Sequence, residues 1–466
     1  MMKNSKKSNA MLLISVLIIV IGIFMPGMFG LSALAMRALF FTVAILLLLV
    51  TETLHIGIVA LLMVVLQPVL GLTGSFAESV SNFNTPIFFF LISAFVIAGA
   101  VQESNLSKRI LKFLLLKFGK TTRGAITAIL LATALLSTVI ANLPALILFY
   151  GISLDFLAMF DDAEDRRQTG KSICIGLIYA ALCGGVCTVV GNMNPMIASA
   201  NLAAAGTSIS FLQWMIVGTP VGVLLFPLML LILFKTFPPV EIEAEKRERF
   251  IQSIQVEAKM GFQERWVTII IILMVIFWLL GSKFPFFNTM HVSICGATLM
   301  LLPCFRIMDW GTANRYIGWA AILLTCAFVS MAAVFTSTGL TEWILTLMNH
   351  VLPADANMIL VLIVLGVITV LTLLLISNGP ALVTIFAPSI IGLASARGIN
   401  PAYLMIPLSM FMAFTVLLPI DSISLVTYAS GTYEMKDELK AGVPFAVCGI
   451  LLISVVTVIM MKIVGF

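Results

Sequence analysis

Two short stretches that resemble each other decide the fold of this chain, ANLPAL at residues 141–146 and SNGPAL at residues 377–382. Each stretch interrupts an apolar run with an asparagine and, two residues later, a proline. Asparagine is a good helix N-cap, and proline fits the first turn of a helix, where its missing N–H costs nothing. Each stretch is therefore predicted to end one helix and start another within apolar surroundings.

The composition places these breaks in a membrane. Of the 466 residues, 61% are hydrophobic and 10% are charged, whereas an ordinary soluble domain has roughly 45–50% and 25%. One soluble core stops growing at about 250–300 residues, so the surplus apolar surface must face lipid. The net charge of +5 comes from short basic blocks between apolar runs, which indicates membrane orientation and not nucleic-acid binding.

Nothing in the sequence indicates an enzyme or a transition-metal site. The histidines His55, His291 and His350 are scattered, and the chain has no HExxH motif. The seven cysteines lie in or beside apolar runs, where they are expected to pack as small hydrophobic side chains. We therefore expect no enzymatic activity and no cofactor.

A helix needs about 20 residues to cross the hydrocarbon core of a bilayer. The breakers divide two apolar segments, 124–160 and 358–395, and each breaker is too short and apolar for a loop outside the membrane. These segments are predicted to be re-entrant hairpins with buried tips. The rest of the all-α chain is predicted to make about eleven crossings, at about 11–33, 35–50, 55–71, 85–102, 171–204, 210–236, 266–282, 289–305, 317–336, 401–433 and 441–463.

Basic residues predict the orientation. Lysine and arginine blocks flank the segment 124–160 on both sides, at residues 108–123 and 166–171, so this hairpin is expected to enter and leave on the cytoplasmic side. The segment 358–395 has no basic excess around it and is expected to enter from outside. We expect an integral protein of the inner (plasma) membrane, with its N-terminus in the cytoplasm and its C-terminus outside.

The two halves of the chain are related. LISAFV at residues 91–96 resembles LTCAFV at residues 324–329, which adds to the match between the breakers. Because the halves enter the membrane from opposite sides, they form an inverted repeat, which is typical of secondary transporters. We expect scaffold helices in residues 1–104 and 266–336, transport parts in residues 105–236 and 337–466, and a cytoplasmic linker in residues 237–265.

A second polar break follows each hairpin, GNMNP at residues 191–195 and PIDSIS at residues 419–424. Facing helix N-termini at the hairpin tips would suit an anion, and free carbonyl groups beside them would suit a small cation such as Na⁺. Asp421 is the least expected residue, because an ionisable group at this depth costs on the order of several kcal/mol unless it is paired or coordinated. Further oxygens are offered by the side chains of Asn192, Asn194, Ser422 and Ser424.

At these residues the sequence resembles the divalent anion/sodium symporter family, whose members carry dicarboxylates, citrate or sulfate. The resemblance covers most of the chain between Thr51 and Gly442 and includes both hairpins and both breaks. It implies an inverted-repeat fold with two opposed re-entrant hairpins. It also implies a homodimer formed through the scaffold and an elevator-type movement of the transport part.

The resemblance also implies the site residues. The family marks each hairpin tip with Ser-Asn-Thr, and this chain keeps both asparagines, one serine and neither threonine. The implied substrate contacts are Asn142, Leu143, Ser377, Asn378 and Gly379. The implied cation ligands are Ser137, Ala141, Asn142, Gly191, Ile376, Asn378, Asp421 and Ser422.

The expected function is therefore cation-coupled symport, with Na⁺ as the coupling ion, of a small divalent anion such as a di- or tricarboxylate or sulfate. The missing tip hydroxyls and the added carboxylate of Asp421 leave three alternatives open. These are anion exchange on the same fold, H⁺-coupled transport through Asp421, and Na⁺/H⁺ antiport without an anionic substrate.

Overall fold

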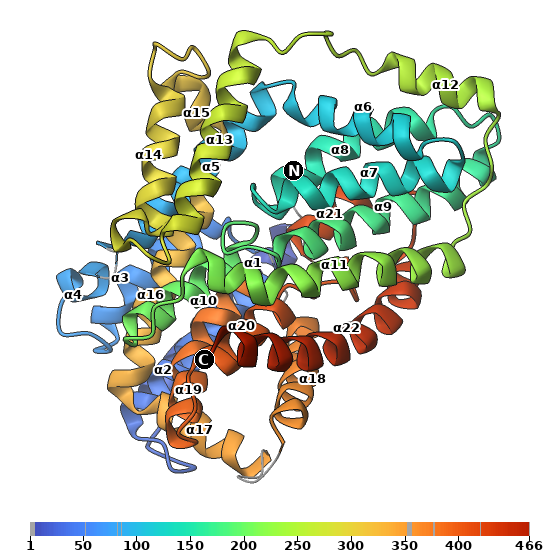
Figure 1. Ribbon diagram of the computed structural model, residues 1–466. Coiled ribbons are helices and arrows are strands. Elements are labelled where there is room, and N and C mark those ends of the chain that lie inside the picture. Colours follow the sequence, from blue (N-terminus) through green and yellow to red (C-terminus); the bar gives the residue numbers. More distant parts are fainter. Residues whose placement is uncertain are drawn as a thin grey trace.

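The computed structural model describes residues 5–51, 53–81, 83–84, 86–351, 357–375, 378–419 and 421–465 (Figure 1). Within these ranges the chain folds into helices and contains no β-strand. The predicted all-α class is therefore confirmed.

The chain contains long apolar helices and several shorter helices. The first part of the chain contains α1 (Ser5–Phe24), α2 (Ala33–Val50), α3 (Ile56–Val69), α4 (Phe76–Ser81), α5 (Pro86–Glu103), α6 (Leu106–Phe118), α7 (Thr122–Ser137), α8 (Asn142–Leu157), α9 (Ala163–Gly185), α10 (Met193–Ala204) and α11 (Phe211–Thr236). The second part contains α12 (Ala244–Ser253), α13 (Phe262–Leu280), α14 (Thr289–Leu301), α15 (Trp310–Tyr316), α16 (Trp319–Thr338), α17 (Leu340–Val351), α18 (Met358–Leu375), α19 (Gly379–Ala396), α20 (Ala402–Phe411), α21 (Ser422–Tyr428) and α22 (Met435–Val464).

Several of these helices can cross a bilayer. In the part of the chain that the structure describes, α2, α11, α13, α16, α19 and α22 are long and apolar enough, and α5 with α6, bent by 61°, can form one further span. Shorter apolar helices, among them α3, α7, α8 and α14, accompany them. The chain is thus a polytopic integral membrane protein, while the total of about eleven crossings stays a prediction.

Both predicted polar breaks interrupt their helices. The segment 171–204 is divided between α9, which ends at Gly185, and α10, which begins at Met193. Asn192 caps α10, because its side chain accepts a hydrogen bond from the backbone N–H of Asn194 at 3.0 Å. The segment 401–433 is likewise divided between α20 and α21, and Asp421 caps α21. Polar caps at both sites supply acceptors that an apolar environment lacks.

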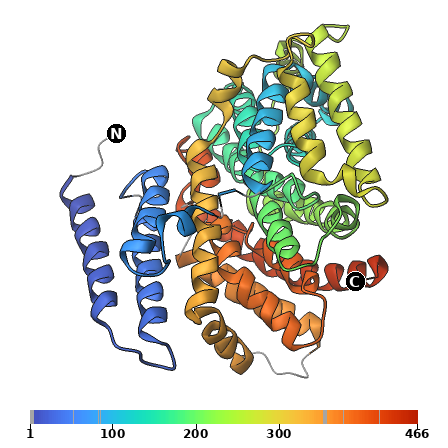
Figure 2. The ribbon, with the colours of Figure 1, turned by 90° about the vertical axis from the view of Figure 1, so that its left-hand side faces the viewer.

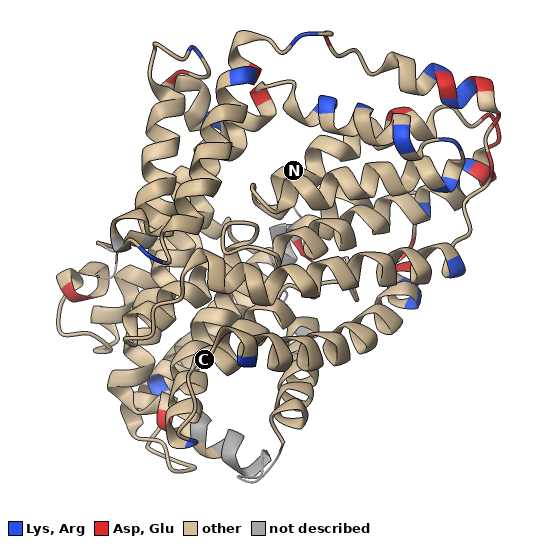
Figure 3. Ribbon diagram, viewed as in Figure 1, with Lys and Arg blue, Asp and Glu red and all other residues tan. Residues whose placement is uncertain are grey.

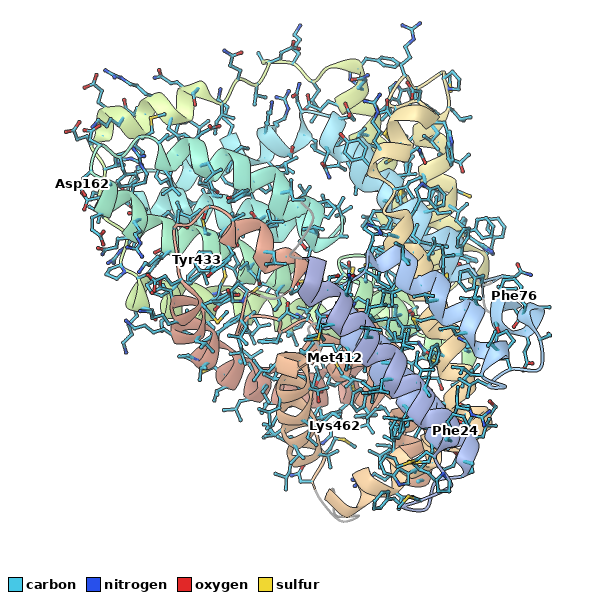
Figure 4. The ribbon with its side chains drawn as sticks, turned by 180° about the vertical axis from the view of Figure 1, so that it is seen from behind. Phe24, Phe76, Asp162, Met412, Tyr433 and Lys462 are labelled. Carbon is cyan, nitrogen blue, oxygen red and sulfur yellow. The ribbon has the colours of Figure 1, made fainter. Side chains whose placement is uncertain are left out.

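Segments from the two parts of the chain pack in matching pairs. In the first part α7 packs against α9, and in the second α18 packs against α20. The helix after each break crosses to the other part, so that α10 packs against α19 and α21 against α8. This crossed packing brings the second breaker next to the first break, since Gly379 lies beside both Asn194 and Met412. Met412 lies near the middle of the molecule in Figure 4.

The two helices on either side of each breaker pack differently in the two halves of the chain. The helices α7 and α8 pack against each other, as expected for a hairpin. The helix α18 instead packs mainly on α20 and α22, while α19 packs on α10, α16 and α17. A separate apolar core joins the helices α2 and α3 to α16, and Figure 2 shows α1 and α2 standing to one side of the other helices.

Charged side chains gather along one edge of the molecule, over α6, α12 and the neighbouring helix ends (Figure 3). Two ion pairs join helices at this edge. Arg109 of α6 binds both carboxylate oxygens of Glu264 at the start of α13, with Nη2 2.9 Å from Oε2. Lys171 of α9 lies 3.1 Å from the carboxylate of Asp437 in α22. The basic blocks that predicted the orientation thus lie on the same edge.

Glycines allow α7, α9 and α11 to pack backbone against backbone. A Cβ atom on Gly184 would lie 1.9 Å from the carbonyl oxygen of Ala134, and one on Gly222 would lie 2.3 Å from that of Cys183. Small residues at such contacts are typical of helices that associate in membranes. The close approach holds the end of α9 against α7, next to the first breaker.

Replacing Gly184 with alanine is expected to lower the thermal unfolding midpoint of the purified protein in detergent. The backbones of α7 and α9 must then move apart, and overpacking of this kind costs about 1–3 kcal/mol. Gly151→Ala in α8 is the control, since a Cβ atom there meets nothing within 4 Å. Equal midpoints for the two variants would contradict the close packing.

Candidate functional site

The first breaker places the side chain of Asn142 in the middle of four chain segments. Asn142 is the first residue of α8 and is 6% exposed. In the orientation that satisfies its neighbours, its amide nitrogen lies 2.7 Å from the Ser137 hydroxyl, 3.1 Å from the Ala181 carbonyl and 2.8 Å from the Gly191 carbonyl. Its amide oxygen accepts a hydrogen bond from the side chain of Asn192 at 2.9 Å. The end of α7, the start of α8, the helix α9 and the first break therefore meet at one amide.

Two glycines make room for this amide. A Cβ atom on Gly185 would lie 2.1 Å from the side chain of Asn142, and one on Gly191 would lie 2.6 Å from the Ser137 carbonyl oxygen. The Ser137 hydroxyl also donates to the Ala181 carbonyl at 2.9 Å. The result is a buried cluster of oxygen atoms with no room for further side chains.

The second breaker lies against the end of α20, the helix that precedes the second break. Asn378 caps α19, because its side chain accepts a hydrogen bond from Ala381 N at 3.0 Å. A Cβ atom on Gly379 would lie 2.5 Å from the carbonyl oxygen of Met412, which follows α20. It would also lie 2.7 Å and 3.0 Å from the amide atoms of Asn194 in α10. The second tip therefore touches the end of α20 and also the first break.

Asparagines link the two tips across the molecule. Asn192 donates to the amide oxygen of Asn142 and accepts from the backbone N–H of Asn194. The side chain of Asn194 then contacts Gly379 at the second tip. Asparagine side chains thus extend from the first hairpin tip, through the first break, to the second hairpin tip.

Asp421 stands at the start of α21. Its carboxylate accepts hydrogen bonds from Ile423 N at 3.2 Å and from the Thr415 hydroxyl at 3.3 Å. Asp421 is half-buried. Its N-capping hydrogen bonds partly offset the free-energy cost of burying its carboxylate.

A second acid lies close by. Glu438 of α22 is 0% exposed, and neither of its carboxylate oxygens has a hydrogen-bonding partner of normal geometry. Its polar neighbours are Ser424, Asp421, Tyr179 and Tyr433. The second break is therefore faced by a fully buried acid that the sequence pattern did not single out.

The structure brings some of the expected site residues together. Ser137, Asn142 and Gly191 meet directly, with Ala141 as the N-cap of α8 just before Asn142. Leu143 is half-buried in the first turn of α8. Asn378 and Gly379 form the second tip, and Asp421 and the backbone of Ser422 start α21. Ile376 and Ser377 lie outside the described residues.

One expectation is wrong. The breaker pattern predicted that Asn142 caps its helix, but Ala141 is the N-cap and makes no side-chain cap bond. The reason is tertiary: hydrogen-bonding groups of α9 and the first break surround Asn142, and its amide serves them instead of its own helix. Asn378 caps its helix as predicted, by accepting from the backbone N–H of Ala381.

The described part of the site offers polar groups of both kinds, helix N-termini and oxygen atoms. The helices α8, α10 and α19 all begin near it, and helix N-termini favour anions. The oxygen cluster around Asn142 is suited to a hard cation. Among the described residues, no group of three or more His, Cys, Asp or Glu side chains could hold a metal ion.

Comparisons with known proteins identify relatives of this chain. Residues 6–466 match the family model described as "Sodium:sulfate symporter transmembrane region". The "Sodium-dependent dicarboxylate transporter SdcS" of Staphylococcus saprophyticus is 24% identical over 421 residues, which cover 84% of this chain and 80% of the relative. The SdcS protein of Staphylococcus aureus (strain USA300) is 25% identical, with coverage of 84% and 79%.

Solved structures share the fold. The Neisseria gonorrhoeae MtrF structure matches with a TM-score of 0.56 at 11% identity, covering 97% of this chain and 94% of its own. The Alcanivorax borkumensis YdaH transporter matches with a TM-score of 0.54 at 13% identity, covering 82% and 87%.

The helical membrane fold and these relatives define the class of the protein, which is a membrane transporter and not an enzyme. Within that class, the chain belongs to the divalent anion/sodium symporter family, because the family model matches nearly its whole length.

Replacing Gly185 with alanine is expected to push the Asn142 amide out of its cluster and to lower the thermal unfolding midpoint. Leaving the buried acceptors around it unpaired costs about 1–3 kcal/mol for each group. The matched test is a double-mutant cycle, since Gly185→Ala should cost much less stability when residue 142 is already alanine. Additive losses in the cycle would show that Gly185 acts elsewhere.

Proposed function

We propose that this protein is a secondary active symporter that carries a small divalent anion together with Na⁺. A di- or tricarboxylate or sulfate is the proposed substrate class. The observation that carries the proposal is the oxygen cluster around Asn142, joined by asparagines to a second helix N-terminus at Asn378. Relatives named sodium-dependent dicarboxylate transporters support it.

The cluster fits Na⁺. The Ser137 hydroxyl and the carbonyls of Ala181 and Gly191 converge on the side chain of Asn142. If that amide is turned, its oxygen takes the place of its nitrogen, and four oxygens then lie next to one another as possible ligands. Backbone carbonyls at an unwound helix are the usual Na⁺ ligands in transporters with broken helices. Asn378, Asp421 and Ser422 are proposed to form a second cation site at the other break.

The anion would bind between the tips. Asn142, Leu143, Asn378 and Gly379 lie at the starts of α8 and α19, whose positive dipole ends favour negative charge. None of the recorded contacts of Asn142, Asn192, Asn194 and Asn378 comes from a lysine or arginine. An anion held only by helix ends and amides would bind more tightly when a cation is bound nearby. This attraction is the physical reason to expect that anion binding and cation binding are coupled.

The proposal extends to the mechanism and assembly. The crossed packing of α10 on α19 and of α21 on α8 supports an inverted repeat, and the packing of α7 on α8 supports the first of two proposed re-entrant hairpins. The transport parts, 105–236 and 337–466, would move as an elevator against the scaffold helices 1–104 and 266–336, with 237–265 as the cytoplasmic linker. A homodimer and an N-terminus in the cytoplasm complete the proposal.

Asn142→Ala and Asn378→Ala are each expected to abolish Na⁺-dependent uptake of a dicarboxylate into proteoliposomes. Each change removes a polar group from a tip, and losing one buried contact to a charged ligand costs about 1.5–3 kcal/mol, or roughly 10- to 100-fold in affinity. Asn201→Ala is the matched control, because this asparagine of α10 bonds within its own helix, to Ile197 O at 2.8 Å.

Uptake that survives both tip changes would refute the site. The substrate itself is best found by thermal-shift measurements with succinate, malate, citrate and sulfate, each with Na⁺ and with a large inert cation. A ligand that binds only the folded protein raises its midpoint by mass action. Stabilisation by an anion only when Na⁺ is present would establish coupled binding, and equal stabilisation without Na⁺ would favour exchange.

A second candidate is H⁺-coupled transport, and the buried acid Glu438 favours it. A carboxylate without hydrogen-bond partners is expensive to bury, whereas its protonated form is not. Glu438 and Asp421 face the same break, so a proton there could replace a cation.

Glu438→Gln keeps the shape of the protonated acid and cannot release a proton. If transport is coupled to H⁺ through this acid, wild-type uptake should change with pH and that change should disappear in Glu438→Gln. Glu434→Gln is the control, because this acid begins the same helix but its side chain is 50% exposed. The same pH profile in all three proteins would exclude the second candidate.

A further inference from the structure

The amide of Asn194 is the least satisfied polar group between the two tips. Asn194 is the second residue of α10 and is 3% exposed. Its side-chain oxygen is buried without a hydrogen-bond partner. Nearly all buried polar groups in proteins are paired, and each exception calls for an explanation such as a ligand or an ion.

The position of this amide is specific. It occupies the space that a side chain at residue 379 would fill, since a Cβ atom there would lie 2.7 Å from Nδ2 and 3.0 Å from Oδ1 of Asn194. Gly379 stands where the resembled family has a threonine at the tip. Asn194, which comes from the other half of the chain, therefore brings the polar group that this tip lacks.

The surroundings of Asn194 suit a carboxylate. The helix α10 has 12 residues, and Asn194 lies in its first turn, where the N–H of Met193 has no partner within the helix, while the N–H of Asn194 is bonded to the Asn192 side chain. Pro195 follows and has no N–H to offer. A carboxylate at this helix end can accept from the amide nitrogen of Asn194 as well as from the helix.

The amide oxygen of Asn194 can only accept hydrogen bonds, so the ligand must also supply a hydrogen-bond donor. A plain dicarboxylate or sulfate also only accepts, so either ligand would leave this oxygen unpaired. A 2-hydroxycarboxylate has a hydroxyl on the carbon next to its carboxylate. The carboxylate can accept from Nδ2 while the hydroxyl donates to Oδ1, which pairs both atoms of one amide with one end of the ligand.

We propose that Asn194 is a specificity-determining residue that selects 2-hydroxydicarboxylates over dicarboxylates without a hydroxyl. This inference rests on the proposed function and narrows its substrate class. Sites built to hydrogen-bond a substrate hydroxyl discriminate against analogues without it, because the site's own polar group is then left unpaired.

The test compares L-malate with succinate, which differ by this one hydroxyl. Affinities are measured calorimetrically on the purified protein in saturating Na⁺ for the wild type, Asn194→Ala and the control Asn201→Ala. In the wild type and the control, malate is expected to bind about tenfold more tightly than succinate, as one hydrogen bond of about 1–1.5 kcal/mol predicts. In Asn194→Ala the ratio is expected to fall close to one, mainly through weaker malate binding.

Each other outcome contradicts part of the argument. Equal affinities of the wild type for malate and succinate would overturn the proposed role of Asn194. A malate preference that survives in Asn194→Ala would also overturn it. A changed Na⁺ affinity in Asn194→Ala with an unchanged malate-to-succinate ratio would make the residue a cation ligand and overturn the inference, while the proposed symport stands. If neither anion binds the wild type with Na⁺, the dicarboxylate function and the inference fall together.

Discussion

The four-way hydrogen bonding of Asn142 is the interaction on which the centre of this protein depends. A helix that stops inside a membrane leaves backbone groups without water, and each must find a partner within the protein. The Asn142 amide meets such groups from α9 and from the first break, as well as the Ser137 side chain. One side chain thereby holds the tip, the helix and the break in a single arrangement.

Glycine packing around this amide makes the arrangement rigid. Gly184 and Gly185 set consecutive contacts of α9, the first against the backbone of Ala134 and the second against Asn142. Neither position has room for a methyl group, so α7, α8 and α9 cannot slide against one another without breaking the amide cluster. In the proposed symport, a site that binds ions through amides and carbonyls would need this rigidity, because such weak ligands discriminate only when their positions are fixed.

The two halves communicate through polar contacts that cross between them. The contacts of Asn142, Asn192 and Asn194 lead to Gly379, so a residue of one half lies against the tip of the other. Placing Glu438 and Asp421 beside the second break gives the halves different chemistry despite their common pattern. In the proposed symport, the first break would serve a cation through neutral oxygens, whereas the second combines neutral groups with acids.

The sequence by itself determined the membrane class, the family, the helical content and the places where helices break. These features depend on composition and on residues a few positions apart, such as Asn378 before Pro380 or Asn192 after Gly191, and local chemistry decides them. Only the tertiary structure decided that Asn142 bonds across to α9 instead of capping α8, that Asn194 reaches Gly379, and that Glu438 is buried at the second break. Each of these contacts joins segments distant in the chain, and the packing of whole helices sets them, so no local pattern could reveal them.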